Sequence, residues 1–151
     1  MMGKLLSEDD SSLIAELASW RCLAELGYTF SRSKRKASHA GAIVSELMFE
    51  NSHKNRCISF FRFSEGIGAV FIKNTSERVH RGFGVEDWLE YHVKDNLDGF
   101  TLEQYRGIKF AKNRTDTEPL FNFLESLFLG PLKSLLLGET WDEVPWLDKY
   151  R

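Results

Sequence analysis

Cysteine is scarce in this sequence, with Cys22 and Cys57 the two copies among 151 residues. Small secreted domains that depend on disulfides carry more, so we expect two reduced thiols buried among apolar neighbours. Long apolar runs are also missing, because the most apolar region, 120–137, is interrupted by polar residues, a glycine and a proline. The start shows no apolar segment typical of a secretory signal. We therefore expect a cytoplasmic protein that does not enter a membrane.

Motifs for metal binding, cofactor binding and catalysis are missing as well. No pair has the spacing of a zinc site, and the histidines are scattered as His39, His53, His80 and His92. There is no Gly-x-Ser-x-Gly elbow, and Cys57 lies in a predicted strand, where a thiol is usually inert. The Gly66-x-Gly68 and Gly82-x-Gly84 pairs lack the context of a dinucleotide site and indicate turns. We expect no enzyme activity, no cofactor and no small-molecule ligand.

What is present is a globular composition with an uneven charge distribution. The length fits a single domain spanning residues 1–151, and the 12 phenylalanines predict an aromatic-rich core. Residues 28–82 hold ten basic and four acidic side chains, whereas the remainder holds ten basic and eighteen acidic ones. If the fold keeps these segments apart, the surface is bipolar and favours specific partners. Alternatively, the two signs intermix in space and cancel.

The first quarter of the chain predicts a helix followed by an edge strand. Ser7 is a good N-cap, an apolar stripe recurs at steps of four, three and four, and Gly27 is suited to end the helix. The stripe comprises Leu13, Leu17, Trp20 and Ala24. The segment from Tyr28 to Ala40 predicts a short edge strand that becomes an exposed loop, because it contains a basic run between Arg32 and Lys36.

The middle of the chain predicts an antiparallel meander. Strands are expected at 43–51, 56–63 and 67–73, joined by tight turns, and Val79 marks a possible fourth short strand. The second of these has apolar residues on both faces, which is typical of a central strand. Helices are expected after Gly84, at a Thr101–Gln104 capping box, and from Thr117 until Gly130-Pro131.

The expected fold class is therefore α+β. It comprises an antiparallel meander sheet of three to four strands, with an N-terminal helix and C-terminal helices packed on it. Trp141 and Trp146 in the tail are expected to lie along the body of the domain.

The helix that follows Gly84 is the best candidate for a partner-binding surface. Its acidic and aromatic residues suit a basic protein partner, such as a nuclease whose cleft normally holds phosphate, because Trp and Tyr dominate binding hot spots. The candidate residues are Glu86, Asp87, Trp88, Glu90, Tyr91 and Asp95. The competing interpretation is an ordinary amphipathic helix with Trp88 in the core.

Nucleic-acid binding is a weaker alternative. The basic run at 32–36, with Arg56 and Arg62 on a following strand, could contact phosphates. Arg81-Gly82-Phe83-Gly84-Val85 resembles the start of the core strand of an RNA-recognition motif. That match ends at Glu86 and Asp87, which would repel phosphate, and the predicted element order is not that of the motif. The overall acidity of the chain also disfavours this alternative.

The whole pattern resembles the immunity proteins of bacterial polymorphic-toxin systems, including contact-dependent growth inhibition. The resemblance rests on the strand Arg56–Phe60, the return strand Gly68–Ile72 and the helix start Phe83–Leu89, and it covers about residues 40–95. It implies a cytosolic, non-catalytic protein that binds and neutralises a cognate toxin domain, and it assigns no functional residue. The alternative is another cytosolic protein-interaction or regulatory module.

Overall fold

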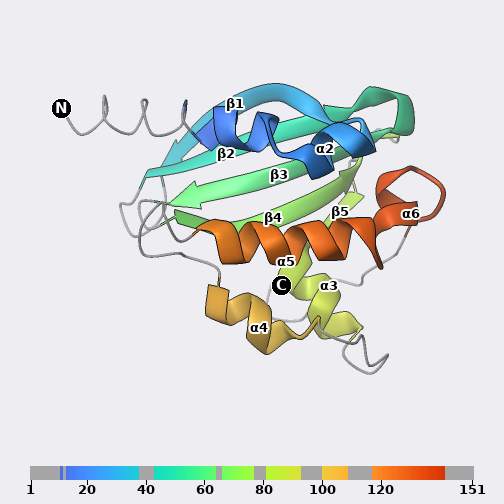
Figure 1. Cartoon of the computed structure of the whole chain (residues 1–151). Coiled ribbons are helices and arrows are strands. Elements are labelled where there is room, and N and C mark those ends of the chain that lie inside the picture. Colours follow the sequence, from blue (N-terminus) through green and yellow to red (C-terminus); the bar gives the residue numbers. More distant parts are fainter. Residues whose placement is uncertain are drawn as a thin grey trace.

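A computed structural model describes residue 11 and residues 13–37, 43–63, 66–76, 81–92, 100–108 and 117–141. Five antiparallel strands form one sheet in the order β1-β2-β3-β4-β5 (Figure 1). They are β1 (Thr29–Ala37), β2 (Ile43–Asn51), β3 (Arg56–Phe63), β4 (Gly66–Asn74) and β5 (Arg81–Gly84). The described helices are α2 (Arg21–Leu26), η1 (Ser52–Lys54), α3 (Val85–Tyr91), α4 (Leu102–Ile108), α5 (Thr117–Leu129) and α6 (Lys133–Leu136).

The α+β class and the meander are confirmed, but the sheet has five strands rather than three to four. The edge strand predicted within Tyr28–Ala40 is confirmed, but the expectation that it is short and becomes an exposed loop is wrong. β1 continues to Ala37 and pairs with β2, with a bulge between Phe30 and Arg32. Its polar side chains give no strand pattern, because an edge strand needs no continuous apolar face. The last strand among the described residues is β5, whereas Val79 lies outside them.

The core lies between one face of the sheet and the helices, as Figure 1 shows for α2 and α5. Inward side chains are paired across the strands, because antiparallel partners point to the same face. The register joins Phe49 to Ile58, Ile58 to Ile72, and Ile72 to Phe83. Leucines and a phenylalanine of α5 pack against this face: Leu120, Leu124, Leu127 and Phe128.

The central position of β3 is confirmed, and its side chains are buried on both faces of the sheet. On the face opposite the core, Ser59 lies between Met48 of β2 and Phe71 of β4. The Lys73 ammonium donates to the Glu46 carboxylate at 2.8 Å and neutralises this nearly buried acid. The side chains of Met48 and Phe71 and the Lys73–Glu46 ion pair therefore lie around the small Ser59 on this face.

The predicted N-terminal helix is interrupted. Residues 13–18 are helical, Trp20 adopts an extended backbone, and α2 then begins at Arg21. The interruption lets the Trp20 ring stack on Phe121 of α5, with ring centroids 5.3 Å apart. It also rotates the apolar stripe, so Ala24 is exposed. Gly27 ends α2 with φ 85°, as predicted, whereas the predicted N-cap Ser7 lies outside the described residues.

Hydrogen bonds from the sheet side anchor the segment that follows α5. The Tyr28 hydroxyl donates to the carbonyl of Leu136 at 2.7 Å. Arg56 donates through Nε to the carbonyl of Leu135 and through Nη2 to that of Thr140, both at 2.8 Å. Its guanidinium lies 5.0 Å from the Trp141 ring. Trp141 thus packs along the body as expected, whereas Trp146 lies outside the described residues.

Both cysteines are free and buried, as predicted. Burial raises the pKa of the Cys22 thiol to about 12, with smaller contributions from Glu125 and Glu25. Burial also raises the pKa of Cys57. Among the described residues, no helix has the length and apolar character needed to cross a membrane.

Candidate functional site

The candidate site begins where β5 passes directly into α3. Gly84 has an extended backbone and is the N-terminal cap of α3, without a side chain to satisfy the first amides. Val85, Trp88 and Leu89 form the buried face of the helix. Glu86 and Asp87 therefore lie in the first turn on the partly exposed face, where the helix dipole favours negative charge.

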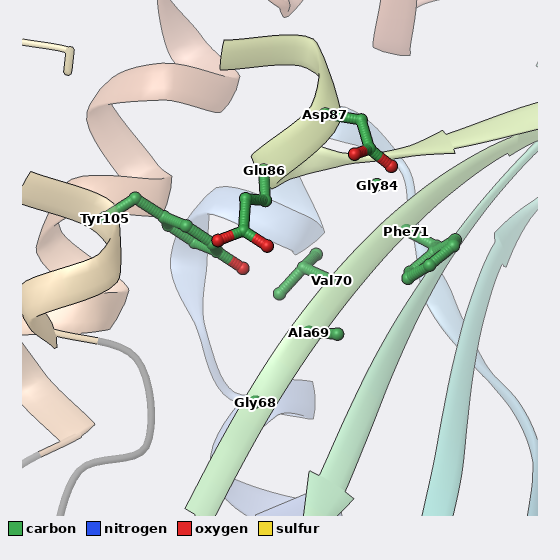
Figure 2. Close-up of a pocket in the computed structure, with 8 residues that line it drawn as sticks. All are labelled: Gly68, Ala69, Val70, Phe71, Gly84, Glu86, Asp87 and Tyr105. Atoms are coloured by element: carbon green, nitrogen blue, oxygen red, sulfur yellow. The ribbon is translucent and has the colours of Figure 1, made fainter. Parts of the chain in front are cut away.

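A small pocket lies beside this turn, with a volume of about 140 Å³. It forms because β5 pairs only with residues 71–74 of β4, so that 66–70 of β4 have no described strand neighbour on that side. Figure 2 shows β4 along one wall, with α3 and α4 supplying the polar side chains of the others. The lining residues are Gly68, Ala69, Val70, Phe71, Gly84, Glu86, Asp87 and Tyr105.

Glu86 joins the pocket to α4. Its Oε1 accepts a hydrogen bond from Arg106 Nε at 2.8 Å, and this bond is the main cause of the raised pKa of Arg106. Figure 2 shows the Glu86 carboxylate and the Tyr105 hydroxyl pointing toward each other. Burial, followed by the charge of Glu86, raises the pKa of Tyr105, and a hydrogen bond with the backbone of Val70 opposes the shift. The phenol therefore stays neutral at physiological pH.

Asp87 lies on the other side of the pocket, over Gly84 (Figure 2). A methyl group added at Gly84 would approach Asp87 Oδ2 at 3.4 Å and the Phe71 ring at 3.5 Å. These are ordinary contact distances, so the glycine leaves room in the pocket without being required by the backbone. Two carboxylates, a phenol and an aromatic ring around a small space suit the cationic head of a lysine or arginine.

The structure brings together some of the predicted partner-binding residues and separates others. Glu86 and Asp87 line the pocket, and Glu90 is partly exposed on the same helix. Tyr91 is 37% exposed but lies at the far end of α3, with its ring 5.0 Å from that of His92. Asp95 lies outside the described residues.

The expectation that Trp88 anchors a partner at the surface is wrong. The side chain is 3% exposed and belongs to the core, which is the alternative interpretation of this helix. Its spacing from Val85 and Leu89 places all three on the inward face, which packs against the sheet. The ring therefore contributes to the core and is not available to a partner at the surface.

Sequence reasoning did not identify Tyr105 or the β4 residues of the pocket. The Thr101–Gln104 capping box is confirmed at the start of α4. The backbone N–H of Gln104 donates to Thr101 Oγ1 at 3.1 Å, and Gln104 Oε1 accepts from the backbone N–H of Thr101 at 3.0 Å. Nothing in that local signal shows that Tyr105 faces β4, because the contact joins segments 35 positions apart. An aromatic residue at the inward position of a short helix was the available clue.

The basic surface expected for nucleic acid does not form as predicted. Arg32, Lys34 and Arg35 are exposed on β1, but Arg56 and Arg62 are each 5% exposed on the helix-covered side of the sheet. Phe83, in the segment similar to the RNA-recognition motif, is buried with its ring centroid 5.3 Å from that of Trp141. It cannot stack on a base from that position.

Two further results bear on function. In the part of the chain that the structure describes, no group of three or more His, Cys, Asp or Glu side chains could hold a metal ion. Comparisons with protein-family models, curated proteins and solved structures found no match.

Proposed function

We propose that this chain is an immunity protein, which binds and neutralises a cognate bacterial toxin domain without catalysis. The acidic pocket between α3, α4 and β4 carries the proposal, because it offers two carboxylates at the surface around a space of about 140 Å³. The sequence resemblance to polymorphic-toxin immunity proteins supports the same function. In this proposal the pocket receives one basic side chain of the toxin, and the outer acidic residues of α3 contact its surroundings.

A basic toxin domain, such as a nuclease, fits this pocket by charge. A nuclease must hold phosphate, so lysines and arginines surround its active site, and covering them would block the substrate. Acidic residues on the inhibitor would also accelerate association by electrostatic steering. The Glu86–Arg106 bond holds one carboxylate in place before binding, so little side-chain entropy is lost on association.

The direct test uses the product of the gene adjacent to the one that encodes this chain. That product is expressed in bacteria alone and together with this chain, and growth and co-purification are measured. We expect growth inhibition that this chain relieves, together with a stable complex. If the product is toxic but neither bound nor neutralised, the immunity function is wrong for that pair. Binding without toxicity would instead favour the alternative, a regulatory protein-interaction module.

Neutral variants then test the pocket. Asp87→Asn and Glu86→Gln remove charge while keeping size. Together they should weaken toxin binding by about 10- to 100-fold, which corresponds to a combined loss of about 1.4–2.7 kcal/mol from the two interfacial charges. Matched controls are Glu103→Gln and Glu118→Gln, both exposed and outside the pocket lining. Equal affinities for the pocket and control variants would remove the pocket from the interface while leaving the immunity function open to a different surface.

A further inference from the structure

The strand β1 is the most exposed part of the sheet. It has nine residues, and all seven side chains from Thr29 to Arg35 are exposed. Within the described residues its strand neighbour is β2, so its outer edge presents the backbone amides and carbonyls of alternate residues. An edge of this length is a template for strand addition unless its side chains prevent pairing.

The charged side chains of β1 point to both faces of the sheet. Arg32 is paired with Met48 and Lys34 with Glu46, two residues of β2 that share one face of the sheet. Arg35 is paired with Ser45, which lies on the other face of the sheet. The first two cations therefore lie on the face opposite the core helices, and the third lies on the helix side. An added strand would place its own side chains on both faces in the same alternation. Cations on both faces thus match an extended peptide with acidic side chains.

Charge also excludes a second copy of this chain as the occupant. Arg32, Lys34, Arg35 and Lys36 fall within five consecutive positions of β1. Any antiparallel register that pairs the middle of β1 with itself would place cations opposite cations, which is destabilising. A nucleic-acid strand is a weaker fit, because phosphates cannot complete a peptide ladder and would meet cations on one face at a time.

We propose that the outer edge of β1 accepts an acidic, extended segment of a partner protein as an additional antiparallel or parallel strand. The backbone ladder supplies affinity, and the cations on both faces select acidic segments while repelling copies of this chain. At the start of the strand, Phe30 is 38% exposed and contacts Phe49, so it offers an apolar contact to the added strand. This surface is separate from the acidic pocket, because β2 and β3 lie between β1 and the pocket strand β4.

The test uses a synthetic peptide as long as β1, in which pairs of Glu alternate with pairs of Thr so that carboxylates lie on both faces, and a matched peptide with Lys in place of Glu. Affinity is measured by fluorescence titration, and hydrogen exchange of the β1 amides is followed by NMR. We expect the Glu peptide to bind and to protect every second amide of β1, and the Lys peptide not to bind. The double variant Arg32→Glu/Lys34→Glu should lose about tenfold or more in affinity.

Control variants separate strand addition at β1 from general charge attraction and from unfolding of the sheet. Lys54→Glu and Lys133→Glu reverse exposed charges outside β1, and neither should change peptide binding. Circular dichroism of the double variant verifies that the sheet is intact. Unchanged affinity in that variant, absence of binding, or protection without the alternating pattern would each overturn the proposal. Binding of a single-stranded oligonucleotide in preference to the Glu peptide would replace it with a nucleic-acid surface. Glu86→Gln should leave peptide binding unchanged, which keeps this result separate from the pocket.

Discussion

Gly82 and Gly84 have different roles, although they are two residues apart in β5. A methyl group added at Gly82 would come within 2.9 Å of the Ile72 carbonyl oxygen, a backbone atom that cannot move aside. At Gly84 the nearest atom would be the flexible Asp87 carboxylate at 3.4 Å. The first glycine is required by close strand packing, whereas the second leaves the pocket open.

We therefore expect Gly82→Ala to lower the free energy of unfolding by about 1–2 kcal/mol, as overpacking against the backbone does. Gly84→Ala should change it by less than about 0.5 kcal/mol. Urea denaturation of the two variants checks this difference. Equal losses would show that β5 can shift to accommodate either side chain.

Cys22 predicts how stability responds to alkaline pH. Its pKa is raised by burial from 9.0 to about 12. The unfolded chain releases the thiol proton above pH 9, whereas the folded chain keeps it, so unfolding releases a proton in this range. The contribution of Cys22 to stability is therefore full below pH 9 and is lost as pH rises toward 12, at up to about 1.4 kcal/mol per pH unit.

Denaturation from pH 8 to 11 of the parent and of Cys22→Ala measures this effect. Above pH 9 the parent should lose stability more steeply than Cys22→Ala. Burial also raises the pKa values of Tyr28 and Tyr105, but both proteins keep these tyrosines, so their effect is the same in each. The slope is the relevant quantity, because removing the sulfur changes packing at every pH. Parallel curves would mean that the thiol becomes solvated before it ionises.

Among the contacts between elements, Arg56 joins β3 to the segment around α6 by hydrogen bonds. It donates to carbonyls of Leu135 and Thr140 on one side, and of Lys54 and Asn55 on the other. A lysine carries one ammonium group and cannot reach these separated acceptors in the same way as the planar guanidinium. Burial lowers the pKa of Arg56, but an arginine stays charged at any ordinary pH.

Arg56→Lys should lower the free energy of unfolding by about 1–3 kcal/mol, because buried carbonyls lose their donors. Hydrogen exchange at Leu136 and Leu137, in α6 and just after it, should accelerate more than exchange in β2. Tyr28→Phe is the smaller matched change, since it removes one hydroxyl bond to Leu136 and should cost about 1 kcal/mol. Uniformly faster exchange in Arg56→Lys would indicate global destabilisation rather than the loss of a local contact.

The elements also differ in how well their own residues predict them. The apolar residues and flanking turns of β2, β3 and β4 mark these strands, and the predicted ranges lie within a residue of the observed bounds. β1 was underestimated because exposed cations occupy both faces, so no alternation of polarity marks it. The break at Trp20 was missed because stacking on Phe121, about a hundred residues away in sequence, stabilises an extended residue in an otherwise helical pattern.

For the whole molecule, the order of the strands separates two charged surfaces. β1 carries exposed cations at one edge of the sheet, and the acidic turn of α3 follows β5 at the other. Among the described residues, the cations of β1 and the acids of α3 thus lie at opposite edges of the sheet, whereas Arg56 and Arg62 are buried in the interior. A partner with both basic and acidic regions could contact both edges, and charge variants of the pocket and of β1 would then act independently on its affinity.

The sequence by itself determined the α+β class, the meander and the acidic outer face of α3, because these follow from alternation, turn residues and helical spacing among near neighbours. Tertiary structure alone decided that Trp88 and Arg56 are buried, that Tyr105 meets β4 to form the pocket, and that β1 is the edge strand of the described sheet. The reason is physical. Local patterns show which face of an element is apolar, whereas the partner of each face depends on long-range packing that buries the most apolar surface at once.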